Sequence, residues 1–204
     1  MAVNAVPGNQ RIGLFGGSFD PVHRAHLSLA HCALAQLSLD RLLWLPAGRP
    51  WQKSGQNLAA PEHRRAMVEL MIAGEPRFAV DDSELAREGA SYTIDTVRQH
   101  LAAVPGAQIF LVIGQDQYER LQTWHDWPAL LGLVTLAVAA RHGMAVQASA
   151  EVAAVPHPLQ VLAMPELPFS STDVRAKAAR GEDIRPLVGD AVAGYIARHR
   201  LYSE

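Results

Sequence analysis

Residues 11–26 read RIGLFGGSFDPVHRAH, and this stretch decides the fold. The apolar run Ile12–Phe15 is typical of a buried strand, and Gly16-Gly17 ends it. Asp20 is predicted to cap the helix that follows, with Pro21 at its first position, where no amide donor is needed. A strand, a glycine turn and a helix N-terminus direct amides and the helix dipole at one point. The pattern therefore indicates a phosphate-binding loop.

Two histidines, His23 and His26, lie in the first turns of the predicted helix. At a spacing of three residues, both rings project from the same side of the helix. The pair has two other interpretations, as ordinary surface residues or as two ligands of a metal ion. A metal site needs a third ligand, and Cys32 falls on the apolar stripe of the helix instead. We favour contact with nucleotide phosphates and expect no metal held by the protein itself.

The chain has 204 residues, a hydrophobic content of 49% and a formal net charge of −2. These values predict one domain over residues 11–204, preceded by a flexible tail at residues 1–10. The near-neutral charge indicates neither a nucleic-acid partner nor a membrane partner. The single cysteine excludes an internal disulfide, and no run is typical of a signal peptide or a membrane span. We expect a cytoplasmic protein, with a homo-oligomer left open.

Apolar runs alternate with helical periodicities along the rest of the chain. Strands are predicted at 42–45, 78–80, 109–113, 134–139 and 161–164. Helices are predicted at about 22–37, 61–71, 91–101, 174–179 and 188–196, with short helical pieces around 121 and 130. This alternation predicts an α/β fold, a doubly wound parallel sheet of Rossmann-like type. Ligands of such folds bind at the carboxyl ends of the strands.

A second group of polar residues lies in the sequence FSSTDVR at 169–175. Ser170 and Asp173 have the spacing of a capping box, which by itself explains the serine. The hydroxyl groups of Ser171 and Thr172, with Arg175 on the first turn, exceed what a cap requires. They indicate a second anion-binding helix terminus, at which Arg175 can hold phosphate oxygens in bidentate fashion.

GGSFDPVHRAH together with FSSTDVR resembles the nucleotidyltransferase superfamily, which shares the phosphate-binding motif H-x-G-H. Within it, the chain is most similar to the bacterial nicotinate-nucleotide adenylyltransferases. The supporting segments are Ser91-Tyr92-Thr93, Gly114-Gln115-Asp116 with Leu121 and Trp124 after it, and the ending from Leu187 to Tyr202. The resemblance implies transfer of the adenylyl group of ATP to nicotinate mononucleotide. Deamido-NAD and pyrophosphate would form, as a step of NAD biosynthesis.

The resemblance also implies roles for individual residues. An ATP site would comprise Gly16, Gly17, Ser18, Phe19, His23, His26, Gly114, Asp116, Ser171, Thr172 and Arg175. Among these, the catalytic residues would be His23, His26 and Arg175. A nicotinate mononucleotide site would comprise Gly17, Ser18, Phe19, Lys53, Tyr92, Thr93 and Trp124. Mg²⁺ would arrive with ATP on its phosphates. Because the attacking phosphate is already ionised at neutral pH, the reaction needs positioning and charge neutralisation rather than a general base.

Ala25 stands where the family motif has glycine, and its methyl group narrows the space beside the nucleotide. Two alternatives to the implied function remain. One is an adenylyltransferase of the same fold that acts on nicotinamide mononucleotide or another small nucleotide. Tyr92, Thr93 and Trp124 argue against phosphopantetheine or a flavin as its substrate. The other is a non-catalytic nucleotide sensor, which the presence of both histidines and Arg175 disfavours.

Overall fold

The structure is a computed structural model, and it describes residues 10–48, 58–87, 89–141, 145–165 and 167–203. Within them a six-stranded sheet has the order β3-β2-β1-β4-β5-β6, with every neighbouring pair parallel. The strands are β1 (Arg11–Gly17), β2 (Arg41–Pro46), β3 (Phe78–Val80), β4 (Gln108–Gly114), β5 (Thr135–Arg141) and β6 (Leu159–Met164). The predicted doubly wound, Rossmann-like fold is confirmed. Lys53 and all of the predicted tail except Gln10 lie outside the described residues.

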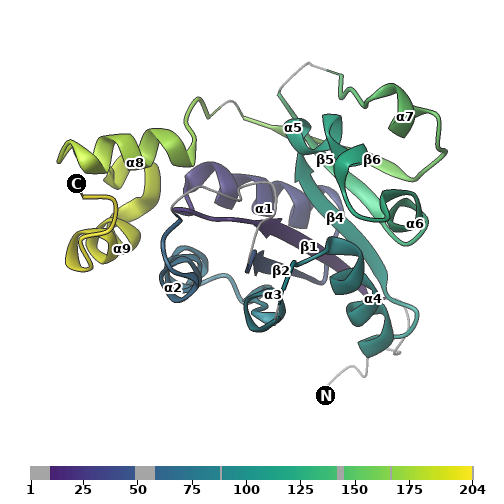
Figure 1. The fold of residues 1–204 in the computed structure, drawn as a ribbon, viewed down its shortest axis with the longest axis horizontal. Coiled ribbons are helices and arrows are strands. Elements are labelled where there is room, and N and C mark those ends of the chain that lie inside the picture. Colours follow the sequence, from purple (N-terminus) through teal and green to yellow (C-terminus); the bar gives the residue numbers. More distant parts are fainter. Residues whose placement is uncertain (1–9, 49–57, 88, 142–144, 166, 204) are drawn as a thin grey trace.

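Helices cover both faces of the sheet (Figure 1). One face is covered by α1 (Arg24–Gln36), α2 (Pro61–Ile72) and α9 (Arg185–Arg198). The other face is covered by α4 (Thr93–Ala103), α5 (Gln115–Glu119), η2 (Leu121–Thr123), α6 (Trp127–Leu131) and α7 (Ala150–Ala153). The remaining helices are α3 (Ser83–Ala86) and α8 (Ser171–Ala179). Within the described residues, no helix has the length and apolar character needed to cross a bilayer.

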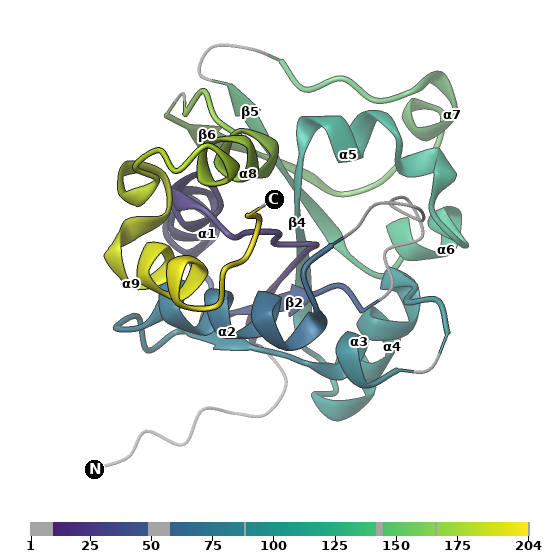
Figure 2. The same ribbon diagram turned by 60° about the vertical axis from the view of Figure 1, so that its left-hand side comes forward.

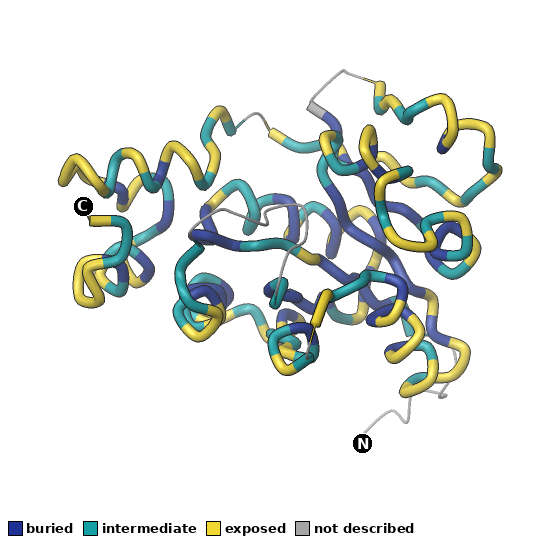
Figure 3. Tube along the Cα trace, viewed as in Figure 1, coloured by how far each residue is buried: buried dark blue, intermediate teal, exposed yellow. Residues whose placement is uncertain are grey.

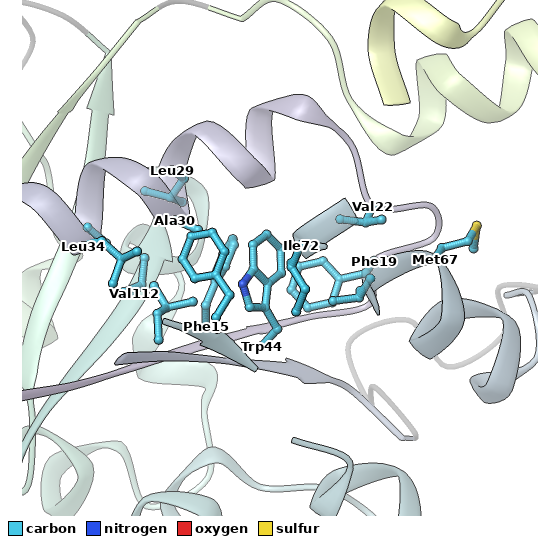
Figure 4. Close-up of a cluster of buried hydrophobic side chains, with 14 of the residues drawn as sticks. Phe15, Phe19, Val22, Leu29, Ala30, Leu34, Trp44, Met67, Ile72 and Val112 are labelled. Carbon is cyan, nitrogen blue, oxygen red and sulfur yellow. The ribbon is translucent and has the colours of Figure 1, made fainter. Parts of the chain in front are cut away.

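Side chains of successive strand residues point to opposite faces, so each central strand contributes to two cores. Phe15 and Trp44 lie beneath α1 with their ring centroids 4.9 Å apart (Figure 4). Their neighbours Leu14 and Leu43 belong to the core on the opposite face. Figure 3 shows the result, a buried central sheet between helices whose outer faces are exposed. Burial on both faces explains why these strands read as continuous apolar runs.

The start of α1 differs from the prediction. The helix begins at Arg24 with His23 as its N-cap residue, so the prediction that Asp20 caps it and that Pro21 opens it is wrong. The Asp20–Pro21 peptide bond is cis, and the Asp20 carboxylate accepts hydrogen bonds from the backbone of Ala59 and from the Tyr202 hydroxyl. Contacts with distant parts of the chain therefore outweigh the local capping preference of aspartate.

Pro186 lies in the first turn of α9, which begins at Arg185. Proline fits this turn because the amide it lacks has no partner within the helix. The helical conformation of α9 is interrupted at Gly189, whose φ of 77° falls in the left-handed region that glycine tolerates.

Candidate active site

A cavity of about 490 Å³ opens where the strand order reverses, at the carboxyl ends of β1 and β4. The strands contribute Gly16, Gly17 and Gly114 to its lining, and the position of a side chain at Gly16 is open space. Its lining includes ten of the residues that the resemblance implies: Gly16, Gly17, Ser18, His23, His26, Thr93, Gly114, Asp116, Trp124 and Ser171. In doubly wound sheets, ligands usually bind at the point where the strand order reverses. The fold thus brings together segments that lie far apart in the sequence.

A larger cavity, of about 880 Å³, adjoins the first. Ala139 and Met164 line it from β5 and β6, and its further wall is formed by the segment that leads into α8. Ala25 and Asp116 line both cavities, so the two meet beside the N-terminus of α1. Both volumes lie in the range of small-molecule sites.

The two predicted histidines form a stacked pair at the start of α1. Their ring centroids are 3.7 Å apart, and the planes are inclined by 26°. The backbone N–H of His23 donates to Nδ1 of His26 at 3.2 Å. Because Nδ1 is the acceptor, a neutral His26 ring carries its proton on Nε2. The Phe19 and His26 rings make an edge-to-face contact with their centroids 5.2 Å apart, which restricts the orientation of His26.

His23 is the more buried of the two rings, with 6% of its surface exposed. Burial lowers its pKa from 6.5 to about 4, although the nearby Asp173 carboxylate acts in the opposite direction. The ring is therefore neutral at pH 7 and supplies an N–H donor rather than a full charge. Both histidines line the smaller cavity, so each ring can present an N–H to a bound anion.

The lowered pKa of His23 predicts a loss of stability in mild acid. Between pH 6.5 and 4 the unfolded chain binds a proton at this position and the folded protein does not, so stability falls as the pH falls. The full change amounts to at most about 3 kcal/mol. Urea unfolding of wild type and His23→Asn at pH 7 and pH 4.5 measures it. We expect the stability advantage of wild type over the variant to shrink at pH 4.5. A stability difference between wild type and variant that is equal at both pH values contradicts this prediction. The matched control is His31→Asn, at an exposed position of α1.

The predicted capping box at the start of α8 is confirmed. The Ser170 backbone N–H donates to Asp173 Oδ2 at 2.7 Å, and the Asp173 backbone N–H donates to Ser170 Oγ at 3.3 Å. The Ser170 hydroxyl also donates to Asp173 Oδ2 at 2.7 Å, and this bond and the one from the Ser170 backbone N–H lower the pKa of Asp173. The next hydroxyl, Ser171 Oγ, donates to the carbonyl oxygen of Pro21 at 2.9 Å. The N-terminus of α8 is thus joined directly to the loop that follows β1.

Arg175 lies one helical turn further along α8. Its Nη1 donates to the backbone oxygen of Asp20 at 2.6 Å, and its Nη2 donates to Thr172 Oγ1 at 3.3 Å. The side chain is 29% exposed, and neither it nor Thr172 is among the lining residues of the two cavities. Of the predicted anion-binding group, the structure therefore brings Ser171 to the smaller cavity and leaves Thr172 and Arg175 beside the loop.

Phe19 and Tyr92 also lie outside the cavity linings. The Phe19 ring is 1% exposed and packs against Trp44 at a centroid distance of 5.3 Å, so only its backbone is available to a ligand. Tyr92 precedes α4 and stacks on His125 at 4.2 Å. This stack joins the start of α4 to the segment that carries Trp124.

Two residues that support the loop, the buried Arg64 and the partly buried Tyr202, were not predicted from the sequence. Arg64 is 1% exposed, and its guanidinium donates to the carbonyl oxygens of Ala59 at 3.0 Å and Ser18 at 2.9 Å. Tyr202 donates its hydroxyl to Asp20 Oδ1 at 2.7 Å. Arg64 had a signal in the sequence, because it shares an apolar helical stripe with Met67 and Val68, where an unpaired charge is costly.

Residues 14–177 of the chain match the cytidylyltransferase-like family. The "Probable nicotinate-nucleotide adenylyltransferase" of Methylibium petroleiphilum is 50% identical, over 98% of this chain and 96% of its own. The protein of the same name from Bordetella petrii is 46% identical, over 95% of this chain and 99% of its own. The chain belongs to the nicotinate-nucleotide adenylyltransferases. The family that GGSFDPVHRAH and FSSTDVR resemble is thereby confirmed.

A solved structure shares the fold. The nicotinic acid mononucleotide adenylyltransferase of Plasmodium falciparum, complexed with APC, has a TM-score of 0.76 and 17% sequence identity. The match covers 95% of this chain and 97% of that one. A second structure of the Plasmodium protein, complexed with NaAD, matches equally well. The chain therefore has the fold of these adenylyltransferases, with Ala25 at its candidate active site.

Proposed function

We propose that this protein transfers the adenylyl group of ATP to nicotinate mononucleotide and releases deamido-NAD and pyrophosphate, as a step of NAD biosynthesis. The observation that carries the proposal is the junction of two nucleotide-sized cavities beside the stacked histidines His23 and His26. A reaction that joins two nucleotides needs both held with their phosphates at one point. The names of the relatives support the same substrates.

We assign the smaller cavity to nicotinate mononucleotide. Thr93 and Trp124 line it, and Gly17 and Ser18 lie at its phosphate end. A pyridinium ring is flat and electron-poor, so it stacks favourably on the face of an indole. Tyr92 would contact the mononucleotide from the edge of this cavity, and Lys53 remains part of the proposed mononucleotide site.

We assign the larger cavity to the adenosine of ATP, with the triphosphate directed toward the histidines. Gly114 and Asp116 follow β4, and Asp116 lies where the two nucleotide sites meet. Ala25 at the start of α1 and Ser170 at the start of α8 both line this cavity, and a helix N-terminus favours an anion. Ser171, Thr172 and Arg175 would hold the β- and γ-phosphates, and Mg²⁺ would arrive bound to those phosphates.

In the proposed reaction, a phosphate oxygen of nicotinate mononucleotide attacks the α-phosphorus of ATP. A new P–O bond forms on one side as the bond to the β-phosphate oxygen breaks on the other, and pyrophosphate leaves with the electron pair. His26 would donate Nε2–H to the α-phosphate, and His23 would donate to a neighbouring phosphate oxygen. Fixed donors of this kind stabilise negative charge that grows in the transition state.

Pyrophosphate release with ATP and either nicotinate mononucleotide or nicotinamide mononucleotide tests the proposed substrate. We expect kcat/KM to be at least about tenfold higher for the acid, because donors at the ring end can pair with a carboxylate. Equal use of both mononucleotides contradicts the acid preference. Binding of ATP without pyrophosphate release from either mononucleotide would favour the nucleotide sensor.

Ala25→Gly tests how the departure from the family motif affects the site. The methyl group lines both cavities, so its removal is expected to lower the KM for ATP by no more than about threefold. Glycine in the first turn of α1 should also reduce the free energy of unfolding by up to about 1 kcal/mol. Steady-state kinetics and urea unfolding measure the two effects. A tenfold rise in the KM for ATP would show that the alanine is itself part of the binding surface.

A further inference from the structure

The carboxylate of Asp20 is 1% exposed and lies behind the phosphate-binding loop. Its Oδ1 accepts hydrogen bonds from the Tyr202 hydroxyl at 2.7 Å and from the Ala59 backbone N–H at 3.2 Å. Its Oδ2 is buried and accepts no hydrogen bond from the described residues, and it lies 3.9 Å from Nη1 of Arg175. The two oxygens of one buried carboxylate thus face a hydroxyl donor and a guanidinium.

The guanidinium of Arg175 is the group that we assign to the ATP phosphates. It already donates to the backbone oxygen of Asp20, on the same residue as the carboxylate. A closer ion pair between Asp20 and Arg175 would draw this guanidinium toward the loop and oppose its donation to a phosphate. Short charge-assisted bonds in a buried setting are strong, so such a pair would compete effectively with a ligand.

The Tyr202 hydroxyl is placed to limit that competition. Burial and the Asp20 carboxylate raise the pKa of Tyr202, so the hydroxyl keeps its proton and remains a donor at any physiological pH. Its bond to Oδ1 fixes the orientation of the carboxylate. Arg64 also lies within electrostatic range of the carboxylate, but its guanidinium is bound to the carbonyl oxygens of Ala59 and Ser18. Without the Tyr202 hydroxyl, the buried carboxylate would therefore turn toward the guanidinium of Arg175.

We propose that Tyr202 is a positioning residue for ATP, because its hydroxyl holds the Asp20 carboxylate and leaves Arg175 available to the triphosphate. The contact joins residues 182 positions apart, near the two ends of the described chain. Figure 2 shows how this is reached, with the C-terminal segment turning back from α9 toward the middle of the molecule. The inference rests on the proposed role of Arg175 in ATP binding.

A matched control separates this role from simple anchoring of the C-terminal helix. Tyr195 lies on α9, and its hydroxyl shares a 2.9 Å hydrogen bond with Nδ1 of His63 on α2. Tyr195→Phe therefore removes a comparable tyrosine hydrogen bond from the same region and leaves the loop untouched. A purely structural effect should appear equally in both variants.

Calorimetric titration with ATP, in the absence of the mononucleotide, measures the effect directly. We expect Tyr202→Phe to weaken ATP binding about five- to tenfold, and Tyr195→Phe to stay within about twofold of wild type. The KM for nicotinate mononucleotide should stay within about twofold in both variants. In an Arg175→Ala background, Tyr202→Phe should have no further effect on ATP affinity, because Tyr202 acts through that guanidinium.

The inference is overturned if Tyr202→Phe binds ATP as tightly as Tyr195→Phe, or if its effect persists in the Arg175→Ala background. If Tyr202→Phe does not fold, Asp20→Asn is the second variant. A neutral amide cannot form an ion pair with Arg175 and competes only weakly for its guanidinium, so ATP affinity should be maintained or rise, and a loss would overturn the inference. Failure of the proposed function is distinguishable, because wild type would then bind ATP without forming pyrophosphate.

Discussion

Replacement of His26 by alanine is expected to lower kcat for pyrophosphate release by a factor of about 10² to 10³. The physical reason is the geometry of the stacked pair: Nδ1 of His26 is occupied by the His23 backbone N–H, which leaves Nε2 to carry the proton. A donor held in this way meets the charge that grows on the α-phosphate without reorganisation. The KM for nicotinate mononucleotide should change little, because the contact strengthens only in the transition state.

The matched control for this prediction is His31→Ala, at an exposed position of the same helix, which should retain wild-type kcat. His26→Gln offers a side-chain N–H with different reach and should recover part of the loss. Steady-state kinetics of pyrophosphate release measure all three. A kcat of His26→Ala within threefold of wild type would remove His26 from the mechanism.

Arg175→Ala is expected to reduce kcat/KM for ATP by a factor of about 10², mainly through a higher KM. The guanidinium is held at the start of α8 by Asp20 and Thr172, a turn away from the Ser171 hydroxyl that reaches the cavity lining. We expect the side chain to turn from the Asp20 carbonyl oxygen toward the outer phosphates when ATP binds. Arg175→Lys keeps the positive charge but cannot make two parallel hydrogen bonds to a phosphate. Its kcat/KM should therefore fall between those of wild type and the alanine variant.

Arg180 provides the control for the arginine substitution. It lies at the end of α8 and is paired with Glu182 on the surface, away from both cavities. Arg180→Ala should leave the KM for ATP within twofold of wild type. If the two alanine variants behave alike, the loss at Arg175 reflects general charge and not a specific contact with ATP.

The fold could be predicted from the sequence because its strands are buried on both faces. Such strands appear as continuous apolar runs, and the predicted strand at 78–80 coincides with β3 while the others agree within two residues. Helix periodicity placed α1 and α2 in the same way. The start of α1 was wrong because capping preference is local, whereas the Asp20 carboxylate is held by Ala59 and Tyr202.

The site residues that belong to short sequence motifs could be predicted. Gly16, Gly17 and the two histidines follow one strand directly, and the fold brings Gly114 and Ser171 to the same cavity. The orientation of Arg175 was not predictable, because it depends on a backbone oxygen that is 155 residues away in the sequence. Tyr202 gave no signal of its own, since nothing in its neighbourhood indicates that its hydroxyl reaches Asp20.

The fate of labelled phosphorus tests the central claim most directly. The protein is incubated with nicotinate mononucleotide and ATP labelled at either the α- or the γ-phosphorus, and the products are separated. Attack at the α-phosphorus predicts that the α-label appears in deamido-NAD and the γ-label in pyrophosphate. Appearance of the γ-label in the nucleotide product, or of the α-label in ADP, would contradict adenylyl transfer and with it the roles given to His26 and Arg175.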